Sequence, residues 1–101
     1  GISISNNILY VADTGNNRIQ LFTLEGYFIA KFGTYGEGDY EFNSPTSVVS
    51  DSYDYIYVAD NGNNRISVYS PTFEILTHIG SYGGPLGAGA GAACSSAGAG
   101  S

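Results

Sequence analysis

Oxygen-bearing side chains that could bind a cation cluster in two Asp-x-Gly-Asn-Asn segments, which begin at Asp13 and at Asp60. Carboxylate and amide oxygens are ligands that calcium prefers, but a calcium ion needs about six to eight of them. Each segment supplies a single carboxylate, which is too few for a closed calcium site. An Asp beside Gly and Asn is typical of a tight turn in which the Asp side chain accepts hydrogen bonds from the turn's own backbone. We therefore predict two structural turns and no metal.

Other catalytic chemistry has little support in the sequence. His78 is the only histidine and Cys94 is the only cysteine, whereas a zinc site needs several such ligands. A nucleophilic serine needs a base beside it, and no such pair is visible. A single cysteine also excludes an internal disulfide. We predict that this chain is not an enzyme and that it binds no cofactor.

The two Asp segments belong to an internal repeat. Tyr10–Ile19 reads YVADTGNNRI and Tyr57–Ile66 reads YVADNGNNRI, at an offset of 47 residues (57 − 10). Repeats of this length are typical of propeller blades or of helical pairs. The apolar segments are short, rich in Ile, Val, Tyr and Phe, and bounded by turn residues, which indicates strands, and no stretch has helical periodicity. Four strands per repeat is the content of a propeller blade.

The fold class that follows is all-β, with two four-stranded antiparallel blades of a β-propeller within residues 1–83, at about 1–33 and 46–80, joined by loop 34–45. In the strand at 27–33 we expect Phe28 and Phe32 on one face, and Tyr27 and Ile29 on the other. Residues 84–101 are mostly Gly, Ala and Ser, and we predict a disordered tail, a linker or a mispredicted end. The eight strands are expected at residues 1–5, 8–13, 17–23, 27–33, 46–51, 55–60, 64–70 and 73–80.

Two longer segments carry a family resemblance. Leu9–Phe22, LYVADTGNNRIQLF, and Ile56–Tyr69, IYVADNGNNRISVY, resemble the NHL repeat, and Phe32–Asp51 resembles its Gly-rich turn followed by Phe-x-x-Pro. Ser47 departs from the family pattern, which usually has Gly there. The resemblance covers roughly residues 1–83 and implies a β-propeller that acts mainly as a binding platform. NHL proteins include ubiquitin-ligase proteins, RNA-binding regulators, bacterial sensor ectodomains and an amidating lyase.

Within each repeated turn we assign structural roles to the Asp, the Gly and the Arg. The two glycines permit positive φ, and asparagine tolerates left-handed backbone better than most residues. The two arginines are expected to be packing or ion-pair elements against an Asp of a neighbouring blade, and not clamps for a ligand. His78 occupies the position of Lys31 in the repeat (78 − 47), and we expect it to face solvent on the outermost strand. The structural turn residues are Asp13, Gly15, Arg18, Asp60, Gly62 and Arg65.

The connection Gly33–Pro45 is acidic and aromatic. In an antiparallel meander this connection and both repeated turns fall at the same end of the blades, and partners usually dock on such loops. We expect Phe42 to be a buried anchor and Tyr35 and Tyr40 to be exposed. The opposite end of the blades has fewer aromatic residues. The candidate partner-binding residues are Tyr35, Glu37, Asp39, Tyr40, Glu41, Asn16, Asn17, Asn63 and Asn64.

Composition limits the partners. The net charge is −6, with three basic residues, so nucleic-acid binding by this chain is not expected. There is no apolar run of about 18 residues, so we predict no membrane span. The chain contains no Met, and we interpret it as a piece of a longer protein.

The expected function is a non-catalytic scaffold that binds a protein or another ligand through one end of a propeller. Two alternatives stay open: a propeller enzyme, a lyase or hydrolase whose metal ligands lie in other blades, and the substrate-recognition propeller of a ubiquitin-ligase or RNA-binding NHL protein. Two isolated blades would leave apolar faces exposed. We therefore expect other blades as partners, from a missing part of the chain or by self-association, and three copies would complete a six-bladed ring.

Overall fold

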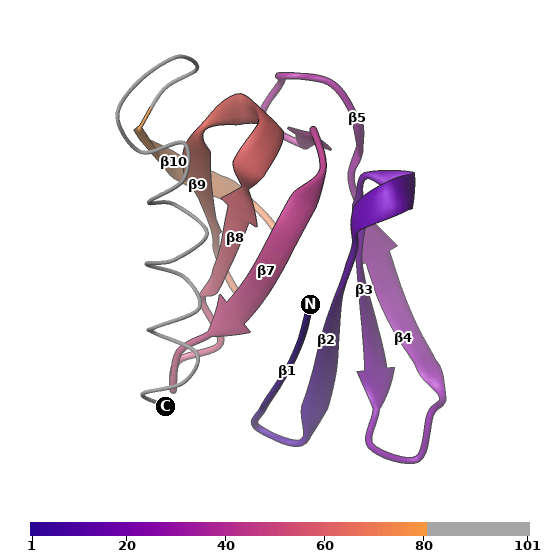
Figure 1. Ribbon diagram of the computed structural model, residues 1–101. Helices are drawn as coiled ribbons and strands as arrows, with labels where there is room; N and C mark the ends of the chain where they lie inside the picture. The colour runs from indigo at the N-terminus through magenta and orange to yellow at the C-terminus, as the bar shows by residue number, and fades with distance from the viewer. Residues whose placement is uncertain (81–101) are drawn as a thin grey trace.

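The computed structural model describes residues 1–80, which form strands and short turns without an α-helix. Two four-stranded antiparallel sheets stand side by side in Figure 1, which confirms the prediction of an all-β fold with two blades. Blade 1 has the strand order β1-β2-β3-β4. Its strands are β1 Ile2–Ser5, β2 Ile8–Asp13, β3 Arg18–Thr23 and β4 Phe28–Phe32.

Blade 2 repeats this arrangement with the order β10-β9-β8-β7. Its strands are β7 Pro45–Ser50, β8 Ile56–Asp60, β9 Arg65–Tyr69 and β10 Ile75–Gly80. The bounds predicted for all eight strands agree with the structure to within two residues. A short parallel pair, β5 Thr34–Tyr35 with β6 Glu41–Phe42, was not predicted, because strands of two residues carry no readable periodicity.

The repeated turns are single 3-10 turns, η1 Thr14–Asn16 and η2 Asn61–Asn63. The left-handed backbone lies at Asn17 (φ 54°) and Asn64 (φ 55°), so it is the asparagines of the turns, and not Gly15 and Gly62, that adopt positive φ. Gly62 has a different role. A Cβ added there would lie 2.5 Å from the Cγ atom of Asn43, so the absence of a side chain allows the connecting loop to approach the turn.

A bulge in β4 changes one predicted face. The pairing register shifts between Leu21 and Phe22, so that Phe28 pairs with Phe22 while Phe32 pairs with Ile19. Phe28 and Phe32 consequently lie on opposite faces of blade 1. The expectation that both lie on the same face was wrong, because the bulge interrupts the regular alternation of side chains along the strand.

The hydrophobic core lies between the blades. The inner face of blade 1 buries Tyr10, Ile19 and Leu21 against Ile56 and Tyr69 of blade 2. The β7 strand packs on β1 and β2, and the Ser3 hydroxyl donates to the Val48 carbonyl. The Phe32 ring of blade 1 also reaches across, with its centroid 5.1 Å from that of Tyr69. The blades therefore share one core and hold each other in place.

The prediction of a low-complexity tail at residues 84–101, and the last predicted domain residues, 81–83, lie outside the described residues. None of the residues that the structure describes forms a helix with the length and hydrophobicity that a membrane span requires.

Candidate functional site

The Asp60 carboxylate is the centre of the blade 2 turn. It is completely buried, and its Oδ2 atom accepts hydrogen bonds from Asn63 Nδ2 (2.8 Å) and Arg65 Nε (3.1 Å). Its Oδ1 atom accepts from the backbone N–H of Asn43 (2.7 Å). A buried charge is tolerated only when it is paired and hydrogen-bonded in this way. The hydrogen bonds to the Asp60 carboxylate thus come from side chains and from the backbone of the connecting loop. The sequence pattern predicted instead that the turn's own backbone N–H groups would donate to it.

Blade 1 repeats the arrangement around Asp13, which accepts hydrogen bonds from Asn16, Arg18 and Gln20. The bond from Arg18, and then that from Asn16, hold the pKa of Asp13 below its ordinary value. Each ion pair lies within its own blade. Asp13 is directly opposite Arg18 across the β2–β3 hairpin, and Asp60 is directly opposite Arg65 across the β8–β9 hairpin. The expected pairing with the Asp of a neighbouring blade was therefore wrong.

Arg65 also holds the connecting loop. Its Nη1 atom donates to the carbonyl oxygen of Glu37 (2.9 Å), and its Nη2 atom donates to those of Gly38 (2.8 Å) and Glu41 (3.1 Å). The planar guanidinium can make all these bonds at once because its donors form a rigid fork. The Arg65 side chain thus bonds both to the buried Asp60 carboxylate and to the backbone of the loop.

Asp39 anchors the loop farther along blade 2. The Tyr69 hydroxyl donates to its carbonyl oxygen at 2.6 Å, and burial raises the pKa of Tyr69 above its ordinary value. The Asp39 carboxylate lies 3.1 Å from Nε2 of His78, whose Nδ1 atom lies 2.9 Å from the Ser67 hydroxyl. His78 is on the outermost strand as predicted, but its ring is held between two partners and does not simply face solvent.

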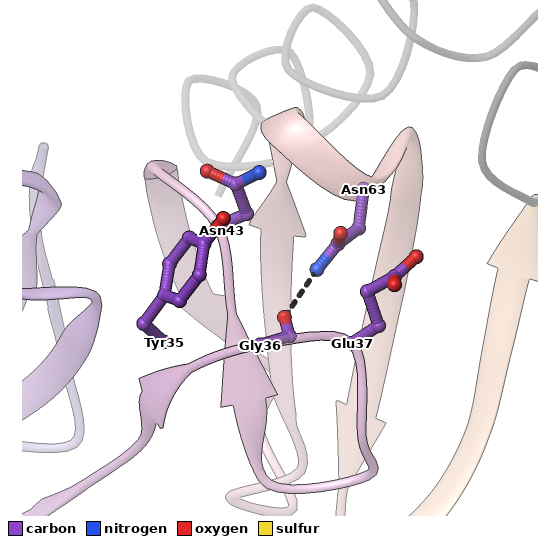
Figure 2. A pocket seen from close by; sticks show the side chains of 5 residues that line it. All are labelled: Tyr35, Gly36, Glu37, Asn43 and Asn63. Carbon is purple, nitrogen blue, oxygen red and sulfur yellow. Dashed lines mark hydrogen bonds between the residues drawn. The ribbon is translucent and has the colours of Figure 1, made fainter.

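A cavity of about 380 Å³ lies between the loop and the blade 2 turn. Figure 2 shows Tyr35 and Glu37 on either side of Gly36, whose carbonyl oxygen accepts a hydrogen bond from Asn63 (2.8 Å). The Tyr35 side chain is 70% exposed. The Glu37 carboxylate has no hydrogen-bond or ionic partner within residues 1–80. The lining residues are Tyr35, Gly36, Glu37, Asn43 and Asn63.

A second cavity, of about 540 Å³, also has Tyr35 in its wall. Its character is basic, because it contains Arg18 and Lys31, two of the three basic residues of the chain. The end of the blades thus offers an acidic and a basic cavity that share one tyrosine. The lining residues are Asn16, Asn17, Arg18, Lys31, Phe32, Gly33, Thr34 and Tyr35.

The structure brings the predicted binding residues to one end but uses many of them internally. Asn63 is buried, and Glu41 accepts a hydrogen bond from the Gly38 N–H at 2.8 Å. The Tyr40 hydroxyl accepts from the Ile75 N–H at 3.0 Å, although its ring is exposed as expected. Asn17 accepts from the Ser44 N–H, and Asn64 ends the η2 turn. Phe42 is fully buried, as predicted.

Asn43 is the residue that sequence reasoning missed. Its carbonyl oxygen accepts a hydrogen bond from the Gly62 N–H at 2.8 Å, its own N–H is bound by Asp60, and it lines the acidic cavity. The only sequence signal was its position directly after the buried Phe42. Among residues 1–80, no group of three or more His, Cys, Asp or Glu side chains is placed to hold a metal ion.

The family of the chain follows from comparison with known proteins. No curated protein matches the chain. Residues 1–79 match the family described as 6-bladed beta-propeller, a stretch that includes both blades and the loop between them. The two four-stranded sheets agree with that description. The chain therefore belongs to the 6-bladed beta-propeller family.

Proposed function

We propose that this chain is part of an NHL-type propeller that acts as a non-catalytic binding scaffold and contacts a basic protein partner through Tyr35 and Glu37. The YVAD-x-GNNRI motif in both repeats supports the NHL type. One observation carries the binding proposal: the exposed Tyr35 ring and the Glu37 carboxylate, which has no partner within residues 1–80, line the same cavity.

The chemistry of these two residues favours a basic partner. A tyrosine offers a large contact area with few rotatable bonds, so that ordering it on binding costs little entropy. The Glu37 carboxylate and the net charge of −6 attract cationic side chains. A Lys or Arg stem can pack on the Tyr35 ring while its charged group approaches Glu37.

The loop around the two residues supports binding by being fixed in advance. Arg65 holds three of its carbonyl oxygens and Tyr69 holds a fourth. A surface that is ordered before it meets its partner loses less entropy on association. Asp39, Tyr40 and Glu41 use their polar groups in bonds within the chain that fix the loop. In this proposal they position Tyr35 and Glu37 and do not contact the partner.

The test is a titration of the isotope-labelled full chain with short peptides that contain Lys or Arg, followed by NMR. We expect chemical-shift changes at residues 35–37 and 43 that weaken as salt rises. Tyr35→Ala and Glu37→Gln should each lower the affinity about tenfold, which is ~1.4 kcal/mol, with little change in Tm. Tyr53→Ala is the matched control, because Tyr53 is an exposed tyrosine at the opposite end of the blades.

Two results would contradict the proposal. One is a set of chemical-shift changes at residues 52–54 that Tyr53→Ala abolishes. Such changes would place the peptide contact at the end of the blades opposite to Tyr35 and Glu37. The other is tighter binding of acidic peptides than of basic ones. A contact at the Glu37 carboxylate would repel acidic peptides, so this result would exclude Glu37 from the contact.

A further inference from the structure

A third cavity, of about 140 Å³, lies between the two blades. It is at the end opposite the repeated turns, which is the lower end in Figure 1. Its floor is apolar and buried, because Tyr10 and Leu21 of blade 1 and Ile56 of blade 2 are at most 2% exposed. Ile29, at 44% exposed, lies at its rim. The cavity therefore has a dry floor and an opening to solvent.

The bulge in β4 shapes one wall of this cavity. Ala30 pairs with Leu21 and Phe28 pairs with Phe22, which leaves Ile29 as the extra residue without a partner on β3. A bulge redirects a side chain away from the regular alternation of a strand. Ile29 consequently lines the cavity together with Leu21.

Phe73 forms another part of the wall in a strained backbone conformation. Its φ is +67°, in the left-handed region that a bulky side chain rarely adopts. The equivalent residue of blade 1 (73 − 47) is Gly26, for which a φ of +96° costs little. Blade 2 thus keeps a phenylalanine where glycine would be relaxed, and its ring packs on Phe32, with the ring centroids 5.5 Å apart, and lines the cavity.

Asp54 is the one charged residue in the wall. Its Oδ1 atom accepts a hydrogen bond from Asn6 Nδ2 of blade 1 at 2.6 Å, and its Oδ2 atom has no partner within residues 1–80. Burial raises the pKa of the Tyr10 hydroxyl, and the negative charge of Asp54 raises it further. The equivalent residue of blade 1 is Asn7, which adopts the same left-handed backbone (φ 63° against 68°). The turn itself therefore does not need the charge.

The size and the chemistry of the cavity limit what it can hold. An apolar cavity of about 150 Å³ accommodates a benzene ring. A carboxylate beside apolar walls attracts a cation more strongly than it would in open water. The faces of the Tyr10 and Phe73 rings also favour a cation. The ligand that fits these features has one aromatic ring and an ammonium group on a short chain.

We propose that this cavity is a binding site for small arylalkylamines, whose ring enters between Leu21, Ile29 and Phe73 and whose ammonium group donates to Oδ2 of Asp54. Burial of the ring supplies most of the favourable free energy, and the carboxylate selects the cation over a neutral molecule of the same shape. Both blades that line the cavity belong to this chain. The proposal does not rest on the partner site at Tyr35 and Glu37, which lies at the other end of the blades.

The test compares two probes, benzylamine and benzyl alcohol, which have the same shape and differ in charge. Each is titrated into the isotope-labelled full chain and followed by NMR. Benzylamine should change the chemical shifts of Leu21, Ile29 and Phe73. Benzyl alcohol should change the same signals but bind about tenfold more weakly, because it lacks the charged hydrogen bond to Asp54.

Asp54→Asn tests the role of the carboxylate. The variant should keep its fold, because Asn7 has the same backbone conformation in blade 1. It should bind benzylamine about tenfold more weakly and benzyl alcohol as before. Glu25→Gln is the matched control, because Glu25 is an exposed carboxylate in the β3–β4 turn at the same end. Neither Glu25→Gln nor Tyr53→Ala, which changes the residue beside Asp54, should alter the binding of either probe.

Phe73→Gly tests the apolar wall by giving blade 2 the residue that blade 1 has at this position. The variant should lose the binding of both probes, because the ring that covers the aromatic group is gone. Unchanged chemical shifts at residues 35–37, at the other end of the blades, would show that the variant is folded.

Three results would overturn the proposal. The first is equal affinity of the parent chain for benzylamine and benzyl alcohol, and the second is undiminished affinity of Asp54→Asn for benzylamine. Either result would mean that the carboxylate does not recognise the ammonium group. The third is a set of chemical-shift changes at residues 35–37 with none at Leu21, Ile29 or Phe73, which would place benzylamine in the acidic cavity instead.

Discussion

Arg65 and Arg18 occupy equivalent positions of the repeat, yet Arg65 binds three carbonyl oxygens of the connecting loop while Arg18 bonds within the described residues only to Asp13. Within residues 1–80 the connecting loop consequently covers Arg65 of blade 2, whereas no such loop covers Arg18 of blade 1. This difference allows the two halves of the repeat to serve as controls for each other.

The first prediction compares the two aspartates. Asp60→Ala should destabilise the chain by about 3–5 kcal/mol, because Arg65 would lose its carboxylate and remain partly buried with an uncompensated charge. Asp13→Ala should cost clearly less, since Arg18 can turn toward solvent. Urea unfolding of both variants, followed by circular dichroism, measures the difference. Equal losses of stability would show that the connecting loop does not bury the blade 2 turn.

The second prediction concerns Gly33. Its φ is +107°, and an added Cβ would lie 2.5 Å from Cδ2 of the buried Phe42 ring. Gly33→Ala should therefore cost about 1–3 kcal/mol through backbone strain and overpacking. Gly15→Ala is the control, because a Cβ at Gly15 meets nothing within 4 Å, and it should change stability by less than about 0.5 kcal/mol. A measured ranking in the opposite order would be incompatible with this loop geometry.

The third prediction concerns the hydroxyl of Thr46 in β7, which is buried without a hydrogen-bond partner in the described part of the chain. Such a hydroxyl costs free energy because it has lost its water. Thr46→Val replaces it with a methyl group of nearly the same shape and should be neutral or stabilise the fold by up to about 1 kcal/mol. Thermal unfolding measures the change, and a clear fall in Tm would indicate that the hydroxyl has a partner.

The fourth prediction is loss of stability at alkaline pH. Burial raises the pKa of both Tyr10 and Tyr69 above the ordinary value. In the unfolded chain a tyrosine ionises near pH ~10. Their contribution to stability is therefore fully present below about pH 10 and is lost as the pH rises above it. Urea midpoints at a series of pH values measure this slope.

Tyr69→Phe separates the hydroxyl from the ring. The variant should lose about 0.5–1.5 kcal/mol at neutral pH, because the hydrogen bond to Asp39 is gone. Its stability should nevertheless fall less steeply above pH ~10 than that of the parent chain. An unchanged alkaline slope would assign the effect to other tyrosines.

The eight blade strands could be predicted because their information is local. Alternating apolar residues and the turn segments at Asp13 and Asp60 lie next to the strands that they shape. The bulge in β4 could not be predicted, because the pairing of Phe28 with Phe22 depends on how β4 fits its neighbour. The exposure of Tyr35 and the burial of Phe42 were predicted, since a loop needs an apolar anchor and offers its other aromatic residues to solvent.

The sequence by itself determined the repeat, the strands, the two blades and the end on which the candidate site lies. Only the tertiary structure decided which of the candidate side chains are free. Glu37 and Asp39 look alike in the sequence, but Asp39 faces His78, a residue 39 positions away, and the Glu37 carboxylate has no partner in the described chain. The reason is physical: strands arise from neighbours in the chain, whereas a hydrogen bond between distant residues exists only after the blades have packed.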